Sequence, residues 1–156
     1  MEKKNILWFK DISKNDIPAV GGKGANLGEM TNFGIPVPPG FAVTSYAYYN
    51  FLKNGSLEEK IKFELKGLNI DNTDKLMQAS HRIKTAILRA KMPDELAKDI
   101  REAYHRLSGT HDLSVAVRSS ATAEDLPDAS FAGQQNTFLN VSGSDEVVKK
   151  VQECWA

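Results

Sequence analysis

The sequence is poor in the residues that build disulfide and metal sites. It contains a single cysteine, Cys154, so no disulfide can form within the chain. The three histidines, His81, His105 and His111, do not combine with that cysteine in a zinc-ligand spacing. A chain of 156 residues can bury a sizeable core without disulfides or a bound metal ion. We therefore expect an ordinary globular domain, or one part of a larger domain, that is held together by apolar packing.

Long apolar runs and an excess of charge of one sign are also missing. The apolar run at residues 6–9 is far shorter than the roughly 18 residues that span a bilayer. The first residues lead into no apolar stretch of the kind that secretory signals carry. Lys plus Arg number 20 and Asp plus Glu number 20, without the basic excess of a typical nucleic-acid-binding protein. We expect a cytoplasmic protein whose partners include neither a membrane nor nucleic acid.

Short apolar segments alternate with helical patterns along the chain, which predicts an α+β fold. Strands are expected at residues 6–9, 41–43, 114–117 and 137–141. Residues 11–20 are interpreted as a polar connection, followed by a helix over 25–33 that carries Leu27, Met30 and Phe33 on one face and ends at Gly34. Further helices are expected at residues 45–52, 73–90 and 144–155, and from Ser56 and Pro93 onward.

Capping signals precede two of these helices. Ser56 followed by Glu59 matches a capping box, and Ser144 is expected to cap the last helix. No Gly or Pro closes that helix before Ala156, which indicates a truncated chain. A truncation would leave the apolar face of the helix exposed and favour self-association. This face carries Val147, Val148, Val151 and Trp155.

The first candidate site is the glycine-rich segment at residues 21–28. Lys23 is the only Lys or Arg between Lys14 and Lys53, and glycines flank it on both sides. Glycine N–H groups at the start of a helix, with one lysine among them, suit a phosphate. The segment is not a Walker A loop, because Gly24 stands where that motif needs Ser or Thr. From these residues alone, an anion site and a flexible turn with a surface lysine stay equally open.

The second candidate is Arg118, which follows a predicted strand. It is the only Lys or Arg between Arg106 and Lys149, and small hydroxyl residues come directly after it. A lone arginine at a strand end can hold a phosphate through two parallel hydrogen bonds, with the hydroxyls completing the cradle. The alternative, which the residues alone favour, is a structural arginine paired with a nearby acidic side chain. The acidic candidates are Glu124, Asp125 and Asp128.

A third segment and the scattered reactive residues carry weaker signals. Residues 130–137 form a small glycine-bearing loop that can close over a nucleotide or simply connect two elements. His81 and His105 lie in predicted helices and are interpreted as structural. Cys154 is interpreted as a small buried apolar residue of the last helix.

Taken together, these segments resemble the nucleotide-binding domain of the phosphoenolpyruvate synthase family. The resemblance runs from about residue 8 to residue 155 and rests on residues 21–30, 35–41, 117–121, 124–125 and 130–135. It implies that residues 1–156 are the N-terminal fragment of an ATP-grasp domain. The phosphohistidine domain and the pyruvate-binding barrel of that family would lie outside this fragment. The implied reaction converts ATP, pyruvate and water to phosphoenolpyruvate, AMP and phosphate, with Mg²⁺ and a phosphohistidine intermediate.

The resemblance also implies roles for particular residues. Lys23 and Arg118 match positions that contact the ATP phosphates, and Gly133 and Thr137 fall in the loop that covers them. This suits phosphoryl transfer, which depends mainly on positioning and charge stabilisation. No catalytic residue is expected here, because no histidine has the glycine-rich context of the carrier. Likewise, no metal ligand is expected, because the acidic ligands belong to the second half of the ATP-grasp unit.

Asn136 departs from the family pattern, since relatives often carry an acidic residue there. Two other functions compete with the synthase. Rifampicin phosphotransferases share much of the same pattern, and a non-catalytic nucleotide-binding module could share the fold. Residues 134–135, both glutamine, favour the synthase branch over the related dikinases.

Overall fold

The computed structural model describes residues 3–69, 71–122 and 136–156. Helices dominate, and the described strands form two antiparallel pairs, so the expected α+β composition is confirmed. The elements are β1 (Ile6–Trp8), the 3-10 turns η1 (Phe9–Asp11) and η2 (Lys14–Asp16), α1 (Ile17–Asn32), β2 (Phe41–Val43), α2 (Ser45–Asn54), α3 (Leu57–Leu65), α4 (Thr73–Arg89), α5 (Asp94–Ser108), β3 (Val115–Arg118), β4 (Thr137–Val141) and α6 (Ser144–Trp155).

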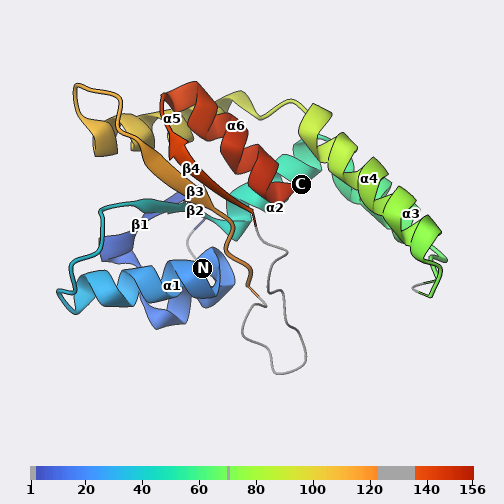
Figure 1. Ribbon diagram of the computed structural model, residues 1–156, viewed down its shortest axis with the longest axis horizontal. Helices are drawn as coiled ribbons and strands as arrows, with labels where there is room; N and C mark the ends of the chain where they lie inside the picture. The colour runs from blue at the N-terminus through green and yellow to red at the C-terminus, as the bar shows by residue number, and fades with distance from the viewer. Residues whose placement is uncertain (1–2, 70, 123–135) are drawn as a thin grey trace.

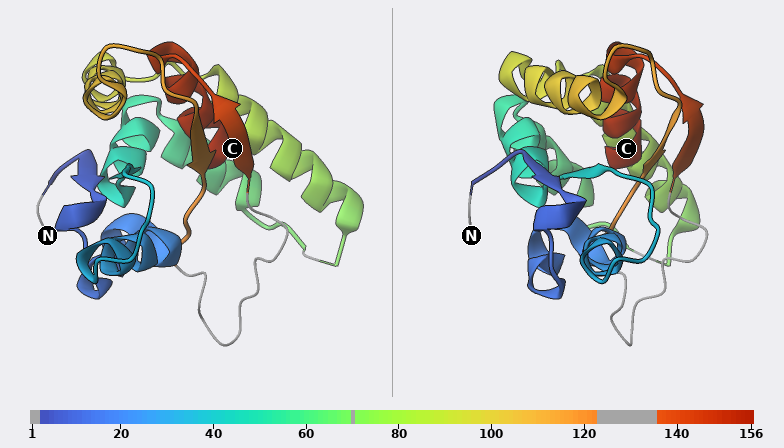
Figure 2. Two further views of the ribbon diagram at one scale, coloured as in Figure 1. Left: turned by 60° about the vertical axis from the view of Figure 1, so that its left-hand side comes forward. Right: turned by 90° about the vertical axis from the view of Figure 1, so that its left-hand side faces the viewer.

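The elements pack around two apolar clusters. The smaller cluster joins α1 to β1 and β2, and its fully buried member is Ile12. The larger cluster lies among α2, α4, α5 and α6, against one face of the β3–β4 pair (Figure 1). The pair of helices α3 and α4 projects away from the rest in Figure 1 and in the left-hand view of Figure 2. No helix in the described part of the chain is both long and apolar enough to cross a bilayer.

Helix α1 begins earlier than the sequence pattern predicts. The polar connection expected at residues 11–20 is wrong: it contains the end of η1, all of η2 and the first turn of α1. The Ser13 side chain and the Asp16 carboxylate form a capping box there, with the Ser13 N–H donating to Asp16 Oδ2 over 2.8 Å. The polar residues of this segment therefore serve as caps, which a hydrophobic pattern does not reveal.

The buried face of α1 is also different from the expected apolar stripe. Phe33 is 79% exposed, whereas the buried positions are occupied by small residues such as Gly24, Ala25 and Gly28. A Cβ added to Gly28 would lie only 2.6 Å from Ile12 Cγ2. Helix α1 thus packs through close backbone approach rather than through large side chains. The predicted end at Gly34 is confirmed, with φ of 73° and a closing bond from the Ile35 N–H to the Met30 carbonyl.

Two of the predicted caps are wrong. Ser56 has a left-handed φ of 51° and makes no capping bond with its side chain, so no capping box forms. Ser144 is the first residue of α6, and the capping position is Gly143. The N–H of Gly143 donates instead to the hydroxyl of the buried Tyr104, over 3.0 Å.

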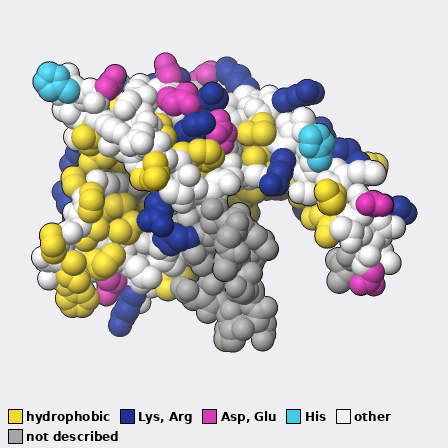
Figure 3. Space-filling view, in the orientation of Figure 1, with side chains coloured by type: hydrophobic (Ala, Val, Ile, Leu, Met, Phe, Trp, Pro, Cys, Tyr) yellow, Lys and Arg dark blue, Asp and Glu magenta, His cyan; other side chains and the backbone are white. Residues whose placement is uncertain are grey.

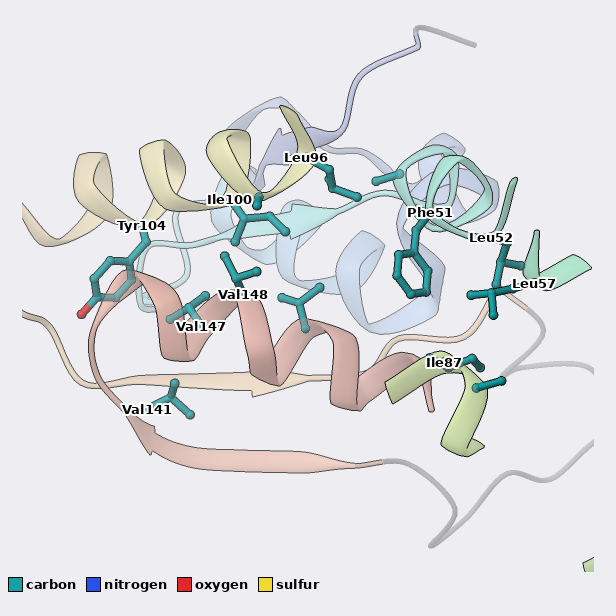
Figure 4. Close-up of a cluster of buried hydrophobic side chains, with 14 residues drawn as sticks. Phe51, Leu52, Leu57, Ile87, Leu96, Ile100, Tyr104, Val141, Val147 and Val148 are labelled. Atoms are coloured by element: carbon teal, nitrogen blue, oxygen red, sulfur yellow. The ribbon is translucent and has the colours of Figure 1, made fainter. Parts of the chain in front are cut away.

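Helix α6 is central to the larger cluster, which overturns the expectation of an exposed apolar face. It lies between α5 and the β3–β4 pair, with Val147 and Val148 pointing into the cluster (Figure 4). Val151 is buried as well, and the Trp155 ring packs 5.1 Å from the Phe51 ring, centroid to centroid. The face that was expected to drive self-association is therefore covered by this chain's own helices.

Candidate functional site

The glycine-rich segment forms a sharp break inside α1. Gly21 has φ of 72° and ψ of 172°, a conformation that side-chain-bearing residues essentially never adopt, and helical geometry resumes after it. Lys23 is thereby placed in the first turn of the second helical segment, where it is half-buried. Only glycine readily adopts this backbone conformation, and a Cβ at position 21 would also lie too close to Ser120.

Two hydrogen bonds tie this break to the segment that follows β3. The Gly22 N–H donates to the Ala121 carbonyl over 3.2 Å, and the Gly24 N–H donates to Ser120 Oγ over 3.2 Å. We call the contact between residues 21–24 and residues 118–121 the α1–β3 junction. Figures 1 and 2 both show β3 descending to meet α1 at this point.

These bonds change the interpretation of the glycine N–H groups. The sequence suggests that they converge on an anion, but those of Gly22 and Gly24 are used by the protein itself. Ser120, expected to complete a phosphate cradle, accepts from the backbone of α1 instead. The junction therefore fixes the position of Lys23, which carries the charge that a phosphate needs.

Arg118 and Thr137 lie directly opposite each other on the two strands of the β3–β4 pair. Opposed residues of an antiparallel pair point to the same face, so both side chains project on one side. Both are exposed, while Val117 and Phe138, the next pair, pack against the larger cluster. Two of the four predicted site residues, Lys23 and Arg118, thus belong to the junction, and Thr137 is paired with Arg118 on the neighbouring strand.

The charge around the junction is basic on the face that Figure 3 presents. Dark blue Lys and Arg side chains gather at the centre of that view, between α1 and β3 (Figure 3). Among the described residues, no carboxylate forms an ion pair with Arg118. The expected structural partners Glu124, Asp125 and Asp128 lie outside the described residues, as does the predicted site residue Gly133.

A groove of about 530 Å³ runs along β4 from Thr137. Its far wall is formed by Glu146 and Lys150 of α6, and the Lys150 ammonium lies 4.7 Å from the centre of the Phe138 ring. A hydrogen bond from this ammonium to Glu153 raises the pKa of Lys150. The groove is therefore bounded by β4 and by a lysine of α6 that remains charged, and Thr137 is the predicted site residue that lines it.

The histidines and the cysteine belong to segments other than the two that form the junction. All three histidines are exposed, and the His105 ring lies 5.9 Å from the ring of the neighbouring Tyr104, centroid to centroid. Burial raises the pKa of the Cys154 thiol to about 11, so it is protonated at neutral pH. Within the described ranges, no three His, Cys, Asp or Glu side chains gather to hold a metal ion.

A lysine held in a glycine turn and an arginine at a strand end are the kinds of cation that bind phosphate groups. The comparison with known families agrees with phosphate binding. Residues 17–156 match the family described as pyruvate phosphate dikinase, AMP/ATP-binding domain, and the chain belongs to that family.

Curated relatives from archaea extend the similarity to nearly the whole chain. A probable phosphoenolpyruvate synthase of Methanocaldococcus jannaschii is 51% identical over 98% of this chain, which covers 13% of that protein. The phosphoenolpyruvate synthase of Pyrococcus furiosus is 44% identical over all of this chain and 23% of its own length. A probable phosphoenolpyruvate synthase of Archaeoglobus fulgidus is 52% identical over 96% of this chain and 20% of its own length. The chain thus spans at most about a quarter of each of these relatives.

Proposed function

We propose that this chain supplies part of the ATP site of a phosphoenolpyruvate synthase and that Lys23 and Arg118 contact the ATP phosphates. The observation that carries the proposal is the α1–β3 junction, in which two bonds hold the Lys23 turn against the segment directly after Arg118. Lysine suits a point contact and arginine a two-pronged one, so the two cations would serve different phosphate oxygens.

Thr137 completes this site from the opposite strand. Its register partner is Arg118, so its hydroxyl is available on the same face of the β3–β4 pair. We include Gly133 in the proposed phosphate-covering loop on the strength of the sequence resemblance alone. The α1–β3 junction would thus define one wall of the nucleotide site.

The complete protein would convert ATP, pyruvate and water to phosphoenolpyruvate, AMP and phosphate, as the names of the relatives suggest. Pyruvate and the phosphohistidine would be bound by domains beyond this chain, and the whole nucleotide-binding unit would be an ATP-grasp domain. The family implies Mg²⁺, but the described residues offer no set of ligands for it. The role of this chain would therefore be to position and neutralise the nucleotide phosphates. We further propose a cytoplasmic location.

The test replaces each cation in the complete protein that carries this chain. Charge-assisted contacts contribute about 1.5–3 kcal/mol each, which corresponds to roughly 10- to 150-fold in rate or affinity. Lys23→Ala and Arg118→Ala should each slow ATP-dependent phosphorylation of the carrier histidine by that factor. Exchange between pyruvate and phosphoenolpyruvate on an already phosphorylated protein should be spared, because that step does not use ATP.

Matched controls come from exposed cations on the helices. Lys98 of α5 and Arg89 of α4 are exposed and lie on other elements, so their alanine variants should phosphorylate at the wild-type rate. Melting temperatures of all four variants separate loss of folding from loss of function. If Lys23→Ala and Arg118→Ala fold normally and phosphorylate at the wild-type rate, the assignment of both residues is wrong.

We also expect the chain by itself to make no phosphoenolpyruvate. None of its three histidines has the glycine-rich context expected of the carrier, and its described residues hold no metal cluster. The purified chain would be incubated with ATP, Mg²⁺ and pyruvate and assayed for product. Turnover above a buffer blank would refute this expectation.

A further inference from the structure

The α1–β3 junction places a bond on each side of Lys23. Gly22, directly before it, bonds to the Ala121 carbonyl, and Gly24, directly after it, bonds to Ser120 Oγ. Of the two acceptors, only Ser120 acts through its side chain. The backbone of Lys23 is therefore held from both sides by the segment that begins two residues after Arg118.

The glycines of the turn permit this closeness. A Cβ on Gly21 would lie 2.7 Å from the backbone carbonyl carbon and oxygen of Ser120 and would overlap its hydroxyl. Ser120 is half-buried against a turn that has no side chain at this point. The serine and the glycines are thus mutually dependent: the missing side chain lets Ser120 approach, and Ser120 supplies the acceptor that Gly24 needs.

We infer that Ser120 is a positioning residue for nucleotide binding: it sets the distance between Lys23 and Arg118 so that both reach one polyphosphate. The inference rests on the proposed function. Ser120 itself would touch no phosphate, because its hydroxyl faces the backbone of α1. Ser120 would affect ATP binding through Lys23, because the N–H from which its hydroxyl accepts belongs to Gly24, the next residue after Lys23.

Ser120→Ala removes the acceptor and leaves the Gly24 N–H without its partner. The loss of one neutral hydrogen bond corresponds to about 3- to 10-fold in affinity. In the complete protein, we expect the KM for ATP in carrier phosphorylation to rise by that factor. Pyruvate exchange on the already phosphorylated protein should be unchanged. Hydrogen exchange at residues 22–24 should become faster in the same variant.

Ser108→Ala is the control for the loss of a serine hydroxyl. The Ser108 hydroxyl lies 3.5 Å from the His105 carbonyl at the end of α5, on an element outside the α1–β3 junction. This variant should keep the KM for ATP within about 2-fold of wild type. If Ser120→Ala fails to fold, Ser120→Cys carries the test, because its thiol keeps most of the volume but is a poor acceptor. The KM should then rise as it would for Ser120→Ala.

A double-mutant cycle separates positioning from general structural support. If Ser120 acts through Lys23, Ser120→Ala should raise the KM by less than about 2-fold when Lys23→Ala is already present. The inference is overturned if Lys23→Ala weakens ATP binding while Ser120→Ala and Ser120→Cys leave it unchanged. It is also overturned if the Ser120 effect persists in full without Lys23. If Lys23→Ala itself has no effect, the proposed function has failed instead.

Discussion

A protein can require glycine because the backbone has a positive φ or because another atom lies too close for a Cβ. Alanine substitution at Gly21, Gly28 and Gly34, in α1 and directly after it, can separate these two reasons. Gly21 has a positive φ and also faces Ser120 at close range. Gly34 has a similar φ of 73°, but no atom lies within 4 Å of a Cβ built there. Gly28 has ordinary helical geometry, but its Cβ would lie 2.6 Å from Ile12 Cγ2. Gly21 therefore combines a positive φ with a close contact, Gly34 has the positive φ alone, and Gly28 has the close contact alone.

The expected magnitudes differ accordingly. A left-handed alanine costs about 1–2 kcal/mol, which sets the loss of stability for Gly34→Ala. Overpacking costs about 1–3 kcal/mol, and at Gly28 the better helix propensity of alanine offsets roughly 1 kcal/mol of this. At Gly21 the backbone strain of about 1–3 kcal/mol adds to a similar overlap, with no gain in propensity. Gly21→Ala should therefore destabilise by about 2–6 kcal/mol.

Urea unfolding followed by circular dichroism would measure all three free energies. The slope of the free energy against urea concentration should stay constant across the series, so that midpoints can be compared directly. Gly21→Ala should also lower Tm by on the order of 10 °C, from about 2–4 °C per kcal/mol for a chain of this size. The reasoning is refuted if Gly21→Ala is no more destabilising than Gly34→Ala, since closeness to Ser120 would then contribute nothing.

Three further predictions concern buried or half-buried side chains. Gln152 of α6 donates to the Ile87 and Ala90 carbonyls at the end of α4, over 2.7 and 2.8 Å. Gln152→Ala should therefore lower the free energy of unfolding, measured in urea, by about 1–3 kcal/mol. An unchanged urea midpoint would count against these bonds. The Tyr104 hydroxyl both donates and accepts, so Tyr104→Phe should cost about 1–3 kcal/mol by the same assay, and a neutral effect would contradict its bridging role. Because burial raises the pKa of Cys154 to about 11, its reaction with a thiol reagent should be slow at pH 7 and become faster toward pH 11. The contribution of this thiol to the free energy of unfolding should fall as pH rises above about 9, because the unfolded chain loses the proton first. Rapid labelling of the folded chain at pH 7 would refute this prediction.

Periodicity and turn residues were sufficient to predict several elements. The strand at residues 41–43 matches β2, residues 137–141 match β4, and the helix over residues 73–90 matches α4 to within one residue. Thr44, a residue type favoured at this position, caps α2 by accepting from the Ala47 N–H over 3.3 Å. These features depend on neighbours along the chain, and the local sequence therefore contains the information.

The features that escaped prediction depend on distant contacts or on backbone shape. Helix α1 buries glycine and alanine while Phe33 is exposed, which reverses the rule that large apolar residues mark the buried face. The left-handed Ser56 disables a capping box that is correct as a sequence pattern. In the candidate site, lone cations and the family resemblance singled out Lys23 and Arg118. The hydrogen bond from Gly24 to Ser120 joins residues 96 positions apart, and no local sequence pattern predicts it.

The division into two apolar clusters has a consequence for the order of folding during synthesis. The smaller cluster is assembled entirely from residues 7–42, so it can close while most of the chain is still untranslated. The larger cluster draws on Phe51 of α2 but is completed only by α6, more than 90 residues later. Contacts between segments that are close in sequence form faster than distant ones. The N-terminal third should therefore become resistant to proteases on the ribosome first, and α2 should remain sensitive until α6 emerges.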